Sequence, residues 1–170
     1  VYAPAKGLKL DAIPEAPTSE DIEAAKALVL EVVCDFPFAT EADGANALAA
    51  MFTPLVRPMI AGGVPMAIFD KPQQGTGASL LAEVVALIAT GRRADMTRPK
   101  RTDEEWEKSL SSLLLKGHGV IVLDNLRGVL DSSVLAKLLT AASHETRMLG
   151  RIESISLPVR VTWVATGNNI

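Results

Sequence analysis

The sequence has few residues of the kinds that form covalent or metal-based cross-links. Cys34 is its only cysteine among 170 residues, so neither an internal disulfide nor a cysteine-based zinc site can form within the chain. This excludes a disulfide-built scaffold and favours a reducing, cytoplasmic setting. The two histidines, His118 and His144, have no Cys or clustered carboxylates at ligand spacing, so we predict no zinc site.

Charge of one sign and long apolar runs are also scarce. The formal net charge of −3 gives no global attraction to nucleic acid or to a membrane surface. No apolar run reaches the roughly 20 residues that a membrane-spanning helix needs, so we predict no membrane partner. A Gly-x-Ser-x-Gly nucleophile motif is absent as well, which argues against an α/β-hydrolase.

Short apolar runs alternate with amphipathic segments along most of the chain. We expect an irregular leader at 1–17, a helical extension at 18–60 and a core domain at 61–170. Expected strands lie at 64–69, 120–123 and 159–165, expected helices at 77–90, 102–115 and 131–142, and a hairpin at 145–157. Alternating strands and helices indicate an α/β fold with a mostly parallel sheet.

One segment, Ile68–Leu80 with the sequence IFDKPQQGTGASL, has the layout of a strand, a glycine-bearing loop and a helix start. Such a loop lets backbone N–H groups and the positive end of the helix face a phosphate. The predicted nucleotide contacts are Lys71, Gln74, Gly75, Thr76, Gly77, Ala78, Ser79 and Leu80, with the Ser79 hydroxyl as a Mg²⁺ ligand. A connection that binds no ligand has the same local pattern, and this alternative stays open.

Two further apolar runs each end in a polar side chain. GVIVLD ends at Asp124, a candidate Mg²⁺ partner, and VTWVATGN ends at Asn168, an amide able to orient water. Asp124 as a turn cap and Asn168 as a turn residue are the alternatives. Because ligands of open α/β sheets bind at the carboxyl ends of strands, we expect both side chains at one rim.

The segments DKPQQGTGAS, VIVLDN and VTWVATGNN together resemble the Walker A, Walker B and sensor-1 motifs of AAA+ P-loop ATPases. The longer sequence segments around these motifs are similar to those of ATPase domains of phages and mobile elements that accompany primase or helicase functions. The resemblance implies a three-layer P-loop fold with an N-terminal helical extension and no C-terminal lid. It also implies ATP or ADP with Mg²⁺ as ligand, Asp124 and Asn168 as catalytic residues, and Asn169 as a rival sensor.

The sequence departs from this pattern at the positions that carry most charge. Ala78 replaces the phosphate-binding lysine, and Pro72 replaces the first glycine of the motif. Asn125 replaces the glutamate after Asp124, and an amide cannot accept a proton from water. Lys71 is the candidate substitute cation, and its alternative is a lysine that is solvated or paired with Asp70.

These observations predict a nucleotide-binding, AAA+-like module of a DNA replication ATPase, with hydrolysis in doubt. The alternative is a catalytically inactive P-loop scaffold that acts through protein or DNA contacts. DNA and a homo-oligomeric ring are the further expected partners. A basic stretch at 92–101 could contact a nucleic-acid backbone, although a solvated loop balanced by the following acidic residues is the preferred interpretation.

Overall fold

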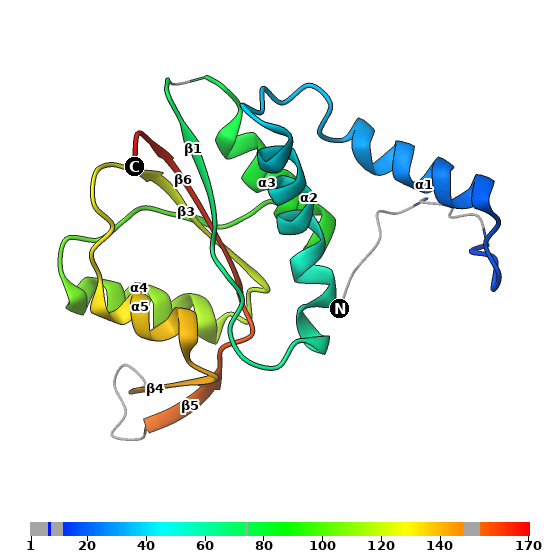
Figure 1. Cartoon of the computed structure of the whole chain (residues 1–170). Helices are drawn as coiled ribbons and strands as arrows, with labels where there is room; N and C mark the ends of the chain where they lie inside the picture. Colours follow the sequence, from blue (N-terminus) through cyan, green and yellow to red (C-terminus); the bar gives the residue numbers. More distant parts are fainter. Residues whose placement is uncertain (1–6, 8–11, 74, 148–153) are drawn as a thin grey trace.

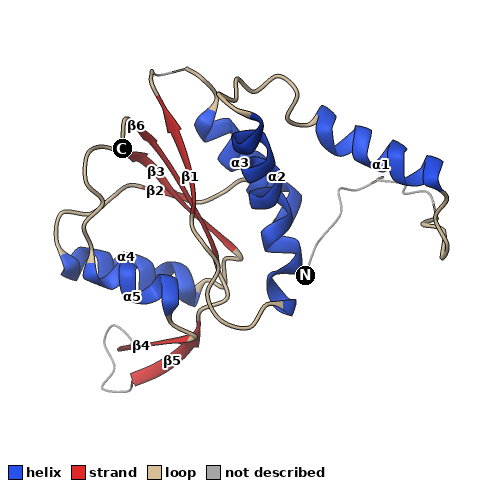
Figure 2. Ribbon diagram, in the orientation of Figure 1, coloured by secondary structure: helices blue, strands red, loops and turns tan. Residues whose placement is uncertain are grey.

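The computed structural model describes residues 7, 12–73, 75–147 and 154–170. Its centre is a four-stranded parallel sheet with the order β1-β6-β3-β2 (Figures 1 and 2). The strands are β1 (Ala67–Lys71), β2 (Met96–Thr97), β3 (Val120–Leu126) and β6 (Thr162–Asn168). The expected α/β class with a parallel sheet is therefore confirmed. The strand β6, last in the sequence, lies between β1 and β3.

Helices cover both faces of this sheet (Figure 2). One face, with Val122 and Val164, packs against α2 (Glu41–Val56) and α3 (Ala78–Thr90). The other face, with Leu123 and Trp163, packs against α4 (Asp103–Leu115) and α5 (Ser133–Thr140). Alternate residues of β3 and β6 thus enter different cores, as the two-residue period of a strand requires. Burial on both faces explains why these strands are apolar at nearly every position.

Hydroxyl side chains begin four of the helices. Thr18 and Thr40 form complete capping boxes with Asp21 and Asp43 at the starts of α1 (Ser19–Glu31) and α2, as their spacing predicts. The hydrogen bonds from the Thr18 backbone and hydroxyl lower the pKa of Asp21. Ser132 caps α5, one residue after the expected Asp131, because the helix starts one position later.

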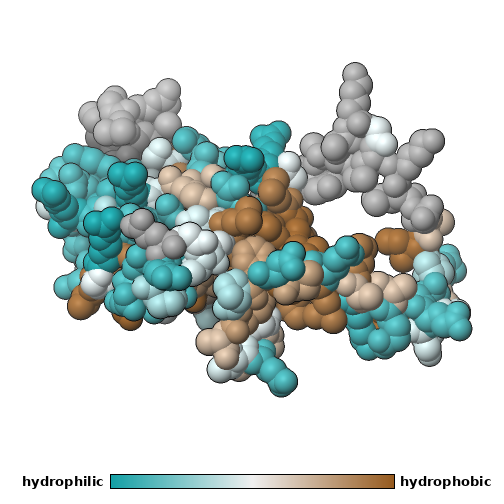
Figure 3. Space-filling model, turned by 90° about the horizontal axis from the view of Figure 1, so that it is seen from above, coloured by the Kyte–Doolittle hydropathy of each residue, from teal (hydrophilic) through white to brown (hydrophobic). Residues whose placement is uncertain are grey.

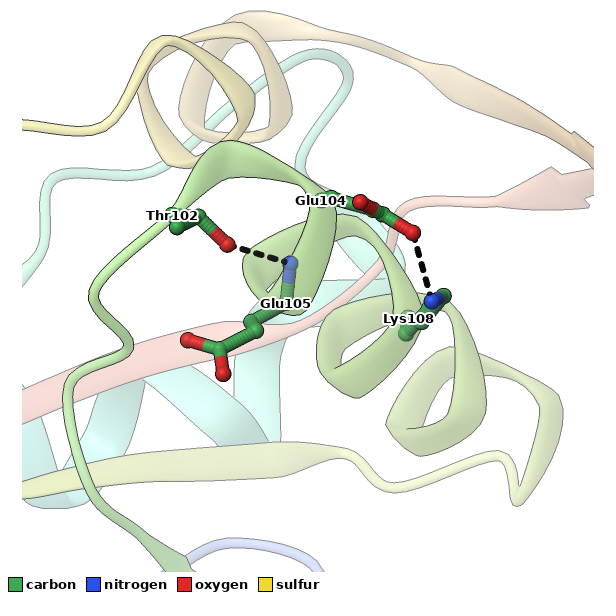
Figure 4. Close-up of polar contacts among 4 residues, drawn as sticks. All are labelled: Thr102, Glu104, Glu105 and Lys108. Atoms are coloured by element: carbon green, nitrogen blue, oxygen red, sulfur yellow. Dashed lines mark hydrogen bonds and ion pairs between the residues drawn. The ribbon is translucent and has the colours of Figure 1, made fainter.

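The start of α4 shows the same chemistry with an added ion pair (Figure 4). The Thr102 hydroxyl accepts a hydrogen bond of 3.3 Å from the Glu105 backbone N–H. One turn on, Lys108 Nζ lies 2.6 Å from Glu104 Oε1. This contact lowers the pKa of Glu104 and raises that of Lys108. Both side chains are exposed, so the pair adds little to stability.

The helix α1 stands apart from the body of the molecule (Figure 1). None of its residues is buried. The chain joins the core only after it, where Val33 is buried and Phe36 packs beside α2 and α3. The helix is therefore not part of either hydrophobic core.

Several expected boundaries are wrong by a few residues. Pro54 does not end α2, which continues to Val56 and then tightens into the 3₁₀ turn Arg57–Met59. Pro54 has no N–H to donate and its ring crowds the carbonyl four residues earlier, yet the helix runs on to Val56. Strand β1 starts at Ala67 rather than at residue 64, and β6 runs through to Asn168 rather than stopping at residue 165.

The expected hairpin is confirmed as an antiparallel pair, β4 (Ser143–Arg147) and β5 (Ser154–Pro158). Its bend at Gly150-Arg151 lies outside the described residues. His144 of β4 is buried, and its Nε2 lies 2.9 Å from Ser111 Oγ and 3.0 Å from Glu107 Oε1. These contacts attach the hairpin to α4.

A buried arginine fastens the segment between α2 and β1. Arg57 is 5% exposed, and its guanidinium donates to the carbonyls of Ile60, Gly62 and Val159 at 2.9, 2.7 and 3.3 Å. Among the described residues it has no carboxylate partner, so carbonyl dipoles alone solvate its charge. No helix in the described part of the chain combines the length and apolarity that crossing a bilayer requires.

Candidate functional site

The candidate site lies at one rim of the sheet because β1, β3 and β6 run parallel. Lys71 at the end of β1 is opposite Asn168 on β6, and Asp124 lies near the end of the neighbouring strand β3. The loop 72–77 leaves this rim from β1 and leads into α3. Three sequence elements that are far apart in the chain are therefore brought together, as the strand-end argument predicts.

The loop leaves its backbone donors free. Gly75 and Gly77 have φ of 86° and 90°, a left-handed region that glycine adopts without strain. Gly77 precedes α3 without a side-chain cap, unlike the residues that begin the other four α-helices. No backbone N–H from Gly75 to Leu80 donates a hydrogen bond to another described residue. Gln74, another predicted contact, lies outside the described residues.

The first turn of α3 meets the end of β3 through a direct hydrogen bond. Ser79 Oγ donates to Asp124 Oδ1 at 2.8 Å. Both side chains are half-buried. The hydroxyl and carboxylate that were predicted to share a cation therefore touch each other. Two further predicted contacts flank Ser79 in the sequence. The Thr76 hydroxyl donates to the Gln73 carbonyl at 3.3 Å, and the Leu80 side chain is exposed.

Thr166 belongs to the same site, although it was not among the predicted residues. Its hydroxyl donates to Asp124 Oδ1 at 2.7 Å and accepts from the Asn125 backbone N–H at 3.0 Å. Thr166 lies two residues before Asn168, so strand alternation places both on one face of β6. Alternation thus gives the face on which Thr166 lies, whereas its contact with Asp124 depends on the pairing of β3 with β6.

The strand β3 is irregular at the site. Its register with β6 shifts between Leu123 and Leu126, which marks a β-bulge around Asp124 and Asn125. Asn125 has φ of 62°, a conformation that asparagine tolerates better than most residues. Bulges of this kind re-aim a side chain, and here the side chain is that of Asp124.

The amide and the lysine at the rim have no polar partner in the described structure. Asn168 Oδ1 is buried without a hydrogen bond to any described residue. Lys71 makes no ion pair within the described part of the chain, and Asp70 Oδ1 instead accepts the backbone N–H groups of Lys71 and Ile170. The alternative of an Asp70-paired lysine is therefore not observed.

A hollow borders the loop on the side of α2. It has a volume of about 840 Å³ and is lined mainly by apolar residues, among them Phe36, Phe38, Phe69 and Ala78. The Phe36 ring lies against Gly77, where an added Cβ would be 3.2 Å from it. From above, apolar side chains gather where α2, α3 and β1 lie (Figure 3). The hollow lies within the size range of small-molecule sites, about 300–1,000 Å³.

The basic stretch at 92–101 is interrupted by the short strand β2. Arg92 and Arg93 follow α3 and precede β2, whereas Arg98 follows it. Since β2 runs parallel to β3, only Arg98 and the residues after it lie toward the rim that holds Asp124. Arg127, which follows β3, is exposed. Arg151 and the side chain of Arg147 lie outside the described residues.

The donor set suits a hard cation better than a transition metal. Ser79 and Asp124 offer oxygen ligands, which Mg²⁺ prefers, with phosphates and water completing its octahedron. Within the described residues no group of three or more His, Cys, Asp or Glu side chains is arranged to hold a metal ion by itself. The residues therefore fit a Mg²⁺ that arrives with a phosphate ligand.

Neither the protein-family models nor the curated proteins contain a match to the chain.

Proposed function

We propose that this chain is a nucleotide-binding module of the P-loop class that takes ATP or ADP together with Mg²⁺. The observation that carries the proposal is the 2.8 Å hydrogen bond between Ser79 and Asp124 beside a loop of free N–H donors. Ser79 and Asp124 would hold the cation, which supplies charge neutralisation of the phosphates. The loop 75–79 would bind the phosphate oxygens.

Binding rather than turnover is the activity that these residues support. Asn125 cannot act as a general base, and Ala78 supplies no charge to the transferred phosphoryl group. Lys71 is the candidate cation, because it ends β1 opposite Asn168 and has no ion-pair partner among the described residues. Asn168, with its unpartnered oxygen, would orient a water or contact the terminal phosphate.

The hollow beside the loop supports a nucleoside rather than an inorganic phosphate as the ligand. Its aromatic and aliphatic walls border Thr76 and Ala78, so a base could occupy it while the phosphates extend along the loop. Phe36 would form one wall. The resemblance to AAA+ replication ATPases gives the proposed context, in which DNA and further copies of the chain are partners.

The test is calorimetric titration of the protein with ATP in the presence of Mg²⁺. We expect saturable binding that Ser79→Ala and Asp124→Ala each weaken by about tenfold, as loss of one interaction with a charged group implies. Ser112→Ala, at an exposed position on α4 away from the loop, is the matched control and should bind as the unaltered chain does. Absence of heat and of a thermal shift at millimolar ATP would favour a scaffold that binds no nucleotide.

A further inference from the structure

Thr166 connects β6 to the end of β3 at the site by hydrogen bonds. It is fully buried and lies on β6, between β1 and β3. Its hydroxyl has one proton and is engaged at both ends: it accepts from the Asn125 N–H at 3.0 Å and donates to Asp124 Oδ1 at 2.7 Å. The donor direction is fixed, because a carboxylate can only accept.

Asp124 receives two protein hydrogen bonds on one oxygen. Ser79 and Thr166 both donate to Oδ1, at 2.8 and 2.7 Å, and no described residue donates to Oδ2. The carboxylate is therefore held in one orientation with its second oxygen available. Ser79 can keep its bond while coordinating a cation, because a hydroxyl coordinates through its lone pairs and retains its proton.

The same hydroxyl supports the bulge that aims Asp124. Asn125 is in the left-handed region with φ of 62°, and its N–H has no strand partner at the register shift. Thr166 accepts that N–H. If the Thr166 hydroxyl were removed, the partly buried Asn125 N–H would have no acceptor. The bulge would then lose the hydrogen bond that fixes it.

We propose that Thr166 is a positioning residue that orients Asp124 for the Mg²⁺ of the bound nucleotide and fixes the turn at Asn125. This inference rests on the proposed function for its ligand. Thr166 does not itself contact the cation or the phosphates. Its effect is therefore confined to the Mg²⁺-dependent part of nucleotide binding, which distinguishes it from a residue that only stabilises the fold.

The experiment compares Thr166→Val, which keeps the shape, with Thr166→Ser, which keeps the hydroxyl. ATP affinity is measured by calorimetry with Mg²⁺ and with EDTA. We expect Thr166→Val to lower the Mg²⁺-dependent gain in affinity about tenfold while leaving affinity in EDTA within about twofold. Thr166→Ser should retain the gain. Thr166→Ala replaces the valine variant if that one does not fold.

A second readout needs no nucleotide. Hydrogen exchange of the Asn125 amide, followed by NMR, should be faster in Thr166→Val and unchanged in Thr166→Ser. Equal Mg²⁺-dependent gain and equal Asn125 protection in the valine variant would overturn the role of Thr166 while leaving nucleotide binding intact. If the unaltered chain binds no ATP under either condition, the proposed function fails, and the assignment toward Mg²⁺ fails with it.

Discussion

At the scale of single residues, the site keeps some residues of the P-loop pattern and replaces others. Ser79 and Asp124 are in contact, but the position after Gly77 is an alanine that is only 8% exposed and lines the hollow beside the loop. A longer side chain there would start at the first turn of α3, beside the loop 75–79 that we propose binds the phosphates. The position is therefore the most direct place to change the electrostatics of the site.

The substitution Ala78→Lys should tighten binding of Mg²⁺-ATP. An ammonium about 4 Å from a phosphate charge contributes up to about 4 kcal/mol in a partly screened site. We expect at least a tenfold gain in affinity by calorimetry, or about 1.4 kcal/mol. Ala78→Met has similar length and no charge, and serves as the control. If lysine and methionine give the same affinity, the loop does not hold phosphate at this position.

The residues of the site were partly predictable, and the reason lies in what each contributes. Ser79, Asp124 and Asn168 follow apolar strands or a glycine loop, so their places at the rim could be read from the sequence. Thr166 could not be assigned in this way, because its role depends on the register between β3 and β6 and on a bulge at Asn125. Neither is visible in a pattern of single strands.

At the scale of elements, the connection between α2 and β1 depends on one buried charge. Arg57 joins the 3₁₀ turn, Gly62 and the chain before β6 through three carbonyls. Nearby, a Cβ on Gly63 would overlap the backbone carbonyl of Leu139 in α5. The segment that leads into β1 is therefore held closely against the opposite end of the molecule from the candidate site.

Replacing Arg57 with methionine should destabilise the fold. The change keeps much of the aliphatic stem but leaves three carbonyls without a donor, at an expected cost of about 3 kcal/mol. Urea unfolding followed by circular dichroism measures this as a lower midpoint with an unchanged slope. Arg92→Met, at an exposed arginine, is the matched control and should leave the midpoint in place. Equal midpoints for both variants would contradict a structural role for Arg57.

Element boundaries were less predictable than element types, for reasons particular to each residue. Pro54 lies inside α2, and the helix continues past it to Val56 although Leu55 and Val56 are exposed. Strand β1 begins two residues after Pro65, and β6 reaches Asn168 because it stays paired with β1 as far as Lys71. Local sequence patterns thus indicate whether a segment is a helix or a strand, whereas contacts between elements determine where it begins and ends.

At the scale of the whole molecule, α1 and the sheet domain are separate in their packing. The helix has its own capping box and no buried residue, whereas Val33, only two residues after its end, is 5% exposed within the core of α2 and α3. The stability of the sheet domain should therefore depend on the chain from Val33 onward and not on the helix before it.

A chain that starts at Val32 should unfold at the same temperature as the full chain, within about 2 °C, because none of the described residues that it loses is buried. A chain that starts at Ala39 lacks Val33 and Phe36 and should melt at a clearly lower temperature. Differential scanning calorimetry of the three proteins makes the comparison. A large loss on removing α1 alone would show that the helix packs on the body in solution.

The strand β1 lies at the border of the described sheet, where it pairs only with β6. Unpaired strand borders invite other chains to add on and so to aggregate. Here Pro65 precedes the strand and Pro72 follows it directly, and neither can donate a backbone hydrogen bond. The two prolines limit any such addition to a five-residue stretch that ends in Asp70 and Lys71, which is too short and too charged to seed a long polymer.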